Sequence, residues 1–262
     1  MKRILILGST GMAGHIVEKY FKEKGKYEIT TLNRKDVDMS DLYEFDLVLS
    51  KIEKDIIINC VGILKPAGDL EAYAKINVCL PRYLEMHSKL NDCKIIHLST
   101  NCVFKGGSNK AEDIPDGTDL YGISKALGEI NDKNNLTIRT SITGPELNKT
   151  RFYNLFNWFM YNTPEEVTGY NDAVWNGVST LQLAMFIDEC IENKRTGLIH
   201  YYTKETVNKA QFLKDLNEIY DLGKKIKGIK SPKGTHMALL EGKFYCEKTL
   251  KEQFKELNGW YC

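Results

Sequence analysis

Short apolar runs alternate with amphipathic segments along the first half of the chain. Apolar runs of strand length lie at residues 3–7, 27–32, 55–60, 94–98 and 136–140. Between them, apolar positions recur at helical spacing in residues 12–24, 42–52, 70–90 and 120–131. Apolar strands separated by helices are typical of a parallel sheet that is covered on both faces. We therefore predict an α/β fold built on a doubly wound parallel sheet.

Three residues mark expected ends or breaks of these helices. Gly25 should stop the first helix, because glycine readily adopts the left-handed conformation found at helix ends. Ser40 should cap the start of the second helix. Pro81 predicts a disturbance in the segment 70–90, because proline removes a backbone donor.

The regular alternation weakens beyond Gly144. An aromatic helix is expected at residues 151–162, further helices at 179–193 and 207–222, and a strand at 198–203. This strand is expected to rejoin the main sheet at its edge. No Gly/Ser linker separates the two halves, so we predict interleaved units. Residues 1–146, rejoined by about 179–203, form one domain, and the smaller C-terminal lobe comprises 147–178 and 204–262.

Composition excludes several classes of protein. The 262 residues include 36 Lys and Arg against 35 Asp and Glu, so no broad basic field would attract nucleic acid or an anionic membrane. We expect no signal peptide, and the sequence contains no long apolar run. Seven cysteines without CxxC spacing indicate reduced, buried thiols and no zinc or other metal site. We expect a cytoplasmic protein.

Glycines gather between the first strand and the first helix, in the stretch GSTGMAG. Glycine permits a tight turn and a close approach to a pyrophosphate, and a helix N-terminus offers unpaired N–H groups. Simple turn glycines are the alternative. In this context we predict a Rossmann-like domain over residues 1–146 that binds a dinucleotide through Gly8, Thr10, Gly11, Met12, Ala13 and Gly14.

The end of the second strand bears on the choice of dinucleotide. NAD sites usually place a carboxylate there, and NADP sites an arginine. Here the strand ends in TTLNRKD, with Asn33 in place of the carboxylate and Arg34 after it. We predict NADP, the alternative being a solvated charged turn. Asp38 and Met39 are expected to cover the adenine.

The segment LYGISKALGE, residues 120–129, places Tyr121 and Lys125 four residues apart. On a helix these side chains share one face, where an ammonium favours the ionised form of a phenol. The spacing alone assigns no chemistry, because it recurs in two other pairs, Tyr20/Lys24 and Tyr220/Lys224.

Four motifs together resemble an extended short-chain dehydrogenase/reductase over nearly the whole chain. They are GSTGMAG after the first strand, NCVG after the third, HLSTNCVFKG after the fourth, and YGISK opening the next helix. The order STxxVFxG, YGxSKxxGE and IRTS is similar to that of dTDP-4-dehydrorhamnose reductase and related nucleotide-sugar 4-ketoreductases. The stretch WNGVSTL, residues 175–181, also resembles a segment of surface-polysaccharide members.

The resemblance implies roles for individual residues. Tyr121 takes the position of the proton donor, Thr100 that of the catalytic Ser/Thr, and Lys125 that of the lysine, which lowers the phenol's pKa and holds the nicotinamide ribose. NADPH would deliver hydride to a sugar carbonyl. Asn77 matches an asparagine that supports the lysine through water. The centre of the cofactor is expected to contact Asn59, Cys60, Val61 and Gly62.

The residues after Thr100 narrow the reaction. Dehydratases of this superfamily have an Asp-Glu pair where this chain has Asn101 and Cys102, so elimination lacks its acid and base. GDP-L-fucose synthase has a proton-shuttling cysteine at the position of Cys102. That enzyme also uses a histidine, and none stands at the matching place here.

The sequence thus predicts an NADPH-dependent reductase of a nucleoside-diphosphate-linked 4-keto-6-deoxy sugar, serving surface-polysaccharide precursor synthesis. Two alternatives stay open: a bifunctional epimerase/reductase that uses Cys102, and a noncatalytic NADP-binding sensor, which would not need the intact catalytic set. The aromatic helix of residues 151–162 is expected in the core or at a homodimer surface. Candidate substrate contacts, with packing roles as the alternative, are Lys65, Cys102, Phe104 and Trp175.

Overall fold

A six-stranded parallel sheet forms the centre of the protein. The structure, a computed structural model, describes residues 1–65, 69–232 and 238–261. All neighbouring strands of the sheet are parallel. This confirms the predicted doubly wound fold. In sheet order the strands are β11 (Gly197–His200), β6 (Leu136–Thr140), β4 (Lys94–Thr100), β3 (Ile56–Asn59), β1 (Lys2–Leu7) and β2 (Tyr27–Leu32).

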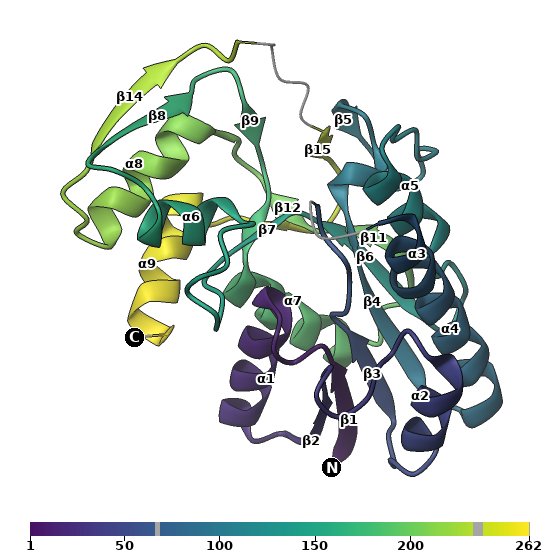
Figure 1. Cartoon of the computed structure of the whole chain (residues 1–262). Coiled ribbons are helices and arrows are strands. Elements are labelled where there is room, and N and C mark those ends of the chain that lie inside the picture. The colour runs from purple at the N-terminus through teal and green to yellow at the C-terminus, as the bar shows by residue number, and fades with distance from the viewer. Residues whose placement is uncertain (66–68, 233–237, 262) are drawn as a thin grey trace.

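Helices cover both faces of this sheet (Figure 1). α1 (Met12–Lys24) and α7 (Thr180–Glu192) lie on one face, and α2 (Leu42–Leu49), α4 (Leu80–Asn91) and α5 (Leu120–Leu127) lie on the other. Successive strand residues point to opposite faces, so the apolar strand β1 supplies both cores. Ile4 and Ile6 pack into the cluster with α1 and α7, whereas Leu5 and Leu7 pack into the cluster with α2 and α4.

The first helix begins and ends as the residues predict, whereas α2 ends at Leu49 instead of residue 52. α1 has the predicted bounds, and Gly25 after it has a φ of 63°, the left-handed conformation that favours glycine. The cap of α2 differs from the prediction. Asp41, the residue directly before the helix, takes the place of Ser40 and accepts hydrogen bonds from the backbone N–H groups of Tyr43 and Glu44.

The segment 70–90 is helical but contains a π-helix. α3 (Leu70–Ala72) leads into the π-helix η1 (Tyr73–Cys79), which runs on into α4. The predicted disturbance therefore lies before Pro81 and not at it. Pro81 occupies the first turn of α4, where its missing N–H costs the helix little.

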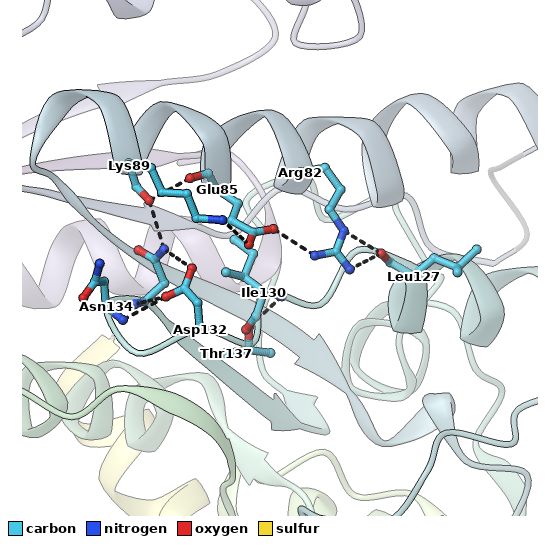
Figure 2. Close-up of polar contacts among 10 residues, drawn as sticks. Arg82, Glu85, Lys89, Leu127, Ile130, Asp132, Asn134 and Thr137 are labelled. Atoms are coloured by element: carbon cyan, nitrogen blue, oxygen red, sulfur yellow. Dashed lines mark hydrogen bonds and ion pairs between the residues drawn. The ribbon is translucent and has the colours of Figure 1, made fainter.

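α5 is shorter than predicted, since it ends at Leu127 instead of residue 131. Figure 2 shows that Arg82 of α4 donates from Nε and Nη2 to the Leu127 carbonyl oxygen, at 3.0 and 2.7 Å. A second contact lies next to it. A Cβ added at Gly128 would come within 1.9 Å of the Asn77 carbonyl oxygen. Packing against α4 and η1 thus fixes where α5 stops.

The expected strand at 198–203 is split in two. β11 pairs with β6 and forms an edge of the main sheet, as predicted, while β12 (Tyr202–Thr203) pairs with β16 (Tyr245–Cys246). Other two-stranded pairs include β7 (Ile142–Thr143) with β10 (Val178–Ser179), β9 (Val174–Trp175) with β13 (Val207–Asn208), and β5 (Gly107–Asn109) with β15 (Ala238–Leu240).

The other C-terminal elements gather at one end of the molecule, at the upper left of Figure 1. They are α6 (Leu155–Tyr161), β8 (Glu166–Tyr170), α8 (Lys209–Ile219), β14 (Lys225–Ile229) and α9 (Leu250–Tyr261). One apolar cluster joins them to the sheet, since it contains Ile6 of β1, Phe156 of α6 and Phe254 of α9. The aromatic helix thus packs in the core. The lobe boundaries stay a prediction.

The cysteines are partly as expected. Among the described residues six are free, and Cys93, Cys190 and Cys246 are buried. Cys79 and Cys102 are exposed, which corrects the expectation of buried thiols, and Cys262 lies outside the described residues. Within the described ranges no helix combines the length and apolar character needed to cross a bilayer.

Candidate active site

The carboxyl ends of β1, β3 and β4 lie side by side and carry most of the candidate residues. Leu7 pairs with Asn59 in the sheet, and Asn59 pairs with His97. Ligands of open parallel sheets bind at this edge. The sheet register therefore brings the segments after these three strands together.

The glycine turn after β1 is built for close backbone approach. Gly8 has a φ of 79°, and a Cβ added at Gly14 would come within 2.1 Å of the Gly8 carbonyl oxygen. Gly11 begins α1 without a side-chain cap, and the first turn of the helix carries no acidic residue. The helix N-terminus thus retains its positive end for an anion. Thr10 is exposed beside it, Met12 is half-buried and Ala13 is buried.

The turn after β2 holds the residues predicted to select the cofactor. The Asn33 side chain accepts from the Lys35 backbone N–H at 2.9 Å, so it stabilises its own turn. Arg34 is exposed. Together with Asp38 and Lys75 it lines a cavity of about 320 Å³.

Asp38 and Met39 differ in exposure, since Asp38 is exposed and Met39 is buried. The Asp38 carboxylate accepts from the Ser40 backbone N–H at 2.9 Å, which lowers its pKa. Met39 is only 5% exposed and packs in the core cluster that contains Phe45. This corrects the expectation that Met39 covers the adenine, because its side chain points inward.

The residues after β3 lie against the glycine turn. A Cβ added at Gly8 would come within 3.1 Å of Val61 Cγ2. Asn59 is fully buried and accepts from the Val61 N–H at 3.0 Å. Burial raises the pKa of the Cys60 thiol to about 12, and Gly62 is exposed.

Asn77, in the π-helix, joins this loop to α5. Its side chain accepts from the Ile63 backbone N–H at 2.9 Å and donates to the Ile63 carbonyl oxygen at 3.1 Å. It also donates to Ser124 Oγ at 3.0 Å. Ser124 directly precedes Lys125, so Asn77 fixes the part of α5 that carries the lysine.

Tyr121 and Thr100 come together as the motifs predict. Asp119 caps α5 by accepting from the Gly122 N–H at 2.9 Å, which places Tyr121 in the first turn. The side chains of Tyr121 and Thr100 are neighbours, since Thr100 is among the groups that affect the pKa of the phenol. Burial raises this pKa, the nearby Cys102 thiol adds to the increase, and Thr100 opposes it.

Lys125 lies on the same helix, but its side chain points toward β4. Its Nζ donates to the Leu98 carbonyl oxygen at 2.7 Å and lies 3.4 Å from His97 Nε2. Burial lowers the pKa of Lys125 to about 8. The sequence predicted that Lys125 lowers the pKa of Tyr121. In this structure burial raises the phenol's pKa instead, and the lysine donates to the backbone of β4.

The other two tyrosine–lysine pairs have packing roles. The Tyr20 hydroxyl donates to Asp188 at 3.3 Å, where α1 meets α7. The Tyr220 ring packs edge-on against Phe156 with the ring centroids 5.4 Å apart. Neither tyrosine lies beside the glycine turn, so the surroundings distinguish Tyr121 from the other two.

The four candidate substrate contacts separate into surface and core positions. Lys65 is half-exposed and its Nζ lies 2.7 Å from Asp119 Oδ2, at the start of α5. Cys102 is exposed as a residue. Its thiol group is nevertheless desolvated by neighbouring atoms, which raises the pKa of the thiol. Phe104 is only 4% exposed and packs against Val103 and Leu240. Phe104 is therefore a core residue, and its expected contact with substrate is corrected.

Trp175 combines packing with an open face. Its Nε1 donates to Ser141 Oγ at 2.7 Å, and its ring packs edge-on against Phe212. It also lines a cavity of about 140 Å³ together with Thr143 and Leu155.

The sequence profile of one protein family, described as the RmlD substrate binding domain, matches residues 1–238. The chain belongs to this family. A dTDP-4-dehydrorhamnose reductase of Aggregatibacter actinomycetemcomitans is 31% identical to this RmlD-family chain over 136 residues, which are 49% of this chain and 46% of the relative. The methionine adenosyltransferase 2 subunit beta of Bos taurus is 25% identical over 139 residues, 49% of this chain and 42% of the relative. The chain spans about half the length of the curated relatives it matches.

A solved structure extends the likeness to the whole fold. The dTDP-4-dehydrorhamnose reductase of Bacillus anthracis, in complex with NADP, matches this RmlD-family chain with a TM-score of 0.84 at 19% identity. The match covers 98% of this chain and 99% of that chain. At this identity the likeness shows the shared fold.

Sequence reasoning missed a buried ion pair in this RmlD-family member. Arg139 Nε and Nη2 each donate to Glu129 at 2.7 Å, and Ser99 Oγ donates to the same carboxylate at 2.7 Å. Both charged side chains are nearly fully buried. The available signal was Arg139 within the apolar strand LTIRT. His97, likewise inside an apolar strand, was also missed.

Proposed function

We propose that the protein is an NADPH-dependent reductase of a nucleoside-diphosphate-linked 4-keto-6-deoxy sugar, acting in the cytoplasm in surface-polysaccharide precursor synthesis. The observation that carries the proposal is the neighbouring pair of Thr100 and Tyr121, with Lys125 on the same helix, at the edge that carries the glycine turn. Family membership and the reductase among the relatives support it.

The residues at the sheet edge fit a dinucleotide. The tight glycine turn, on which α1 packs closely at Gly14, and the uncapped start of α1 suit a pyrophosphate. Arg34, in the cavity after β2, would hold a 2′-phosphate. Asn59 to Gly62 would lie along the centre of the cofactor, and Lys125 would hold the nicotinamide ribose. The bound NADPH would supply the hydride that reduces the ketone.

The protein's own contribution is to hold and protonate the carbonyl oxygen. Tyr121 would donate its proton to the oxygen as negative charge develops there, and Thr100 would donate a second hydrogen bond. The raised pKa of Tyr121 keeps the phenol protonated in the free protein, which suits a proton donor. Lys125, turned from Leu98 toward the ribose, would favour the phenolate left behind.

The rest of the substrate would lie toward the C-terminal elements. The cavity beside Trp175 would receive the distal end of the nucleotide sugar, because it offers an aromatic face and polar groups from Thr143 and Asn208. Lys65 would approach the diphosphate, and Cys102 the sugar.

Tyr121→Phe tests the proposal most directly. NADPH consumption would be followed with a panel of 4-keto sugar nucleotides, and NADPH binding would be measured separately. Loss of the phenolic proton should lower kcat by about 10²- to 10⁴-fold while cofactor binding is retained. Tyr43→Phe is the matched control, because Tyr43 is 75% exposed on α2. Equal turnover by wild type and Tyr121→Phe would refute the proposal.

Two observations favour alternative functions, and the same assay would distinguish them from the reductase. Cys102 is exposed within two residues of Thr100, as an epimerase/reductase would need. Solvent deuterium at sugar carbons, abolished by Cys102→Ser, would support that function. One relative is named as a subunit of another enzyme. NADPH binding without turnover of any sugar nucleotide would support a noncatalytic role.

A further inference from the structure

A chain of buried polar groups connects the loop after β3 with Lys125. The Val61 backbone N–H donates to Asn59 Oδ1 at 3.0 Å, and Asn59 Nδ2 lies 3.1 Å from His97 Nδ1. His97 Nε2 then lies 3.4 Å from Lys125 Nζ. Asn59 and His97 are fully buried and Lys125 is 4% exposed, so each hydrogen bond must be made within the protein.

The chemistry of these groups fixes the direction of every bond. A backbone N–H only donates, so the atom of Asn59 that faces Val61 is the carbonyl oxygen, and the NH₂ group faces His97. The NH₂ group also donates, so His97 Nδ1 accepts and carries no proton. A neutral imidazole has one N–H, which must then be on Nε2, facing Lys125.

An N–H facing Lys125 acts differently on the two forms of the lysine. An ammonium has three donors and no lone pair, so it cannot accept a bond from His97. A neutral amine accepts that bond and still donates to the Leu98 carbonyl oxygen, 2.7 Å away. The arrangement therefore matches the neutral amine.

We propose that Asn59 and His97 form a relay of fixed hydrogen-bond direction that favours the neutral amine of Lys125 until the cofactor binds. His97 is then a positioning residue, which acts through Lys125. The coupling to the cofactor rests on the proposed function, whereas the relay in the free protein does not.

The charged surroundings agree with this assignment. Burial lowers the pKa of Lys125 to about 8, and both Glu129, which follows α5, and Cys60, which follows β3, act in the opposite direction. Burial also lowers the pKa of His97, and the nearby cations of Lys125 and Arg82 lower it further. His97 therefore stays neutral and retains one N–H throughout the range in which Lys125 titrates.

The tautomer of His97 is the first measurement, and it needs no variant. In the full chain without cofactor, ¹⁵N NMR shifts distinguish a protonated from an unprotonated ring nitrogen. We expect a protonated Nε2 and an unprotonated Nδ1. The reverse tautomer would overturn the relay.

The titration of Lys125 is the second measurement. Its ¹³Cε resonance would be identified by its loss in Lys125→Arg and followed against pH. In His97→Leu the midpoint should rise by about one pH unit, because the opposing N–H is gone. His97→Gln is the matched control: its carbonyl can accept from Asn59 while its NH₂ faces Lys125, so the midpoint should stay near that of wild type. An unchanged midpoint in His97→Leu would contradict the proposal.

Coupling to the cofactor is tested by calorimetry in buffers of different ionisation enthalpy. Above pH 8, NADP⁺ binding to wild type should take up protons, and His97→Leu should take up fewer. Binding without proton uptake would refute the coupling. Absence of NADP⁺ binding would instead count against the proposed function, and the tautomer and titration results would still decide the relay.

Discussion

Arg139 and Glu129 hold three elements together next to Thr100. Arg139 belongs to β6, Glu129 follows α5, and Ser99 of β4 donates to the same carboxylate. A buried ion pair adds little compared with an apolar pair of similar size, but removing one partner leaves an uncompensated charge.

Arg139→Met should therefore lower the free energy of unfolding by about 3–5 kcal/mol. The double variant Arg139→Met/Glu129→Met should recover most of that loss, because no buried charge is left alone. Urea unfolding of both variants measures the difference. If the single variant unfolds like wild type, the Glu129 carboxylate left without its partner does not destabilise the core, which contradicts the prediction.

At the residue scale, the sequence predicted which residues form the site better than it predicted the orientations of their side chains. Motif spacing identified Thr100 and Tyr121, which the structure brings together. It could not predict that Met39 turns into the core or that Lys125 faces the Leu98 carbonyl oxygen. Those orientations depend on neighbours that lie far away in the sequence.

At the scale of elements, α5 rests directly on the turn that follows Thr100. A Cβ added at Gly122 would come within 2.2 Å of the Cys102 carbonyl oxygen. Any side chain larger than hydrogen at this position must therefore displace the helix or the turn, together with Tyr121.

Gly122→Ala should destabilise the protein by about 1–3 kcal/mol and lower turnover in the reductase assay. Gly259→Ala, in α9, is the control. It meets no atom within 4 Å and should stabilise the helix by about 0.5–1 kcal/mol. Thermal unfolding of the two variants should move in opposite directions. A shift in the same direction would contradict the close approach.

Hydrophobic periodicity predicted the elements whose ends are set locally. β2, β6 and α1 have the predicted bounds, and Gly25 ends α1 by its own conformation. The periodicity could not predict the end of α5, because Arg82 of another helix binds its last carbonyl group. The π-helix also makes contacts to residues outside it, since Asn77 is hydrogen-bonded to Ile63 and Ser124.

At the scale of the whole molecule, buried histidines make stability depend on pH. The pKa values of the four histidines in the described ranges, His15, His87, His97 and His200, are all lowered, with burial as the largest cause. For His200 the value falls from 6.5 to about 4. The unfolded chain then binds protons that the folded protein does not. The stability that the neutral His200 contributes above pH 6.5 is therefore lost as the pH falls toward 4.

The free energy of unfolding should fall by roughly 2–3 kcal/mol through His200 alone between pH 7 and 4.5. Asp215 and Glu146, whose pKa values are raised by burial, oppose this with smaller shifts. Urea unfolding at several pH values measures the sum, and His200→Gln should flatten the curve. A stability that rises on acidification would contradict the assignment of these histidines as buried and neutral.

The position of β11 has a consequence during protein synthesis. β6 ends at Thr140 and its sheet neighbour begins only at Gly197. At about 5–20 residues per second, the ribosome needs roughly 3–12 s to make the intervening stretch. For that time the nascent N-terminal half exposes the unpaired backbone edge of β6, a surface on which other unfinished chains can pair. Cells that make this protein quickly should therefore rely on chaperones that shield the nascent chain until β11 emerges.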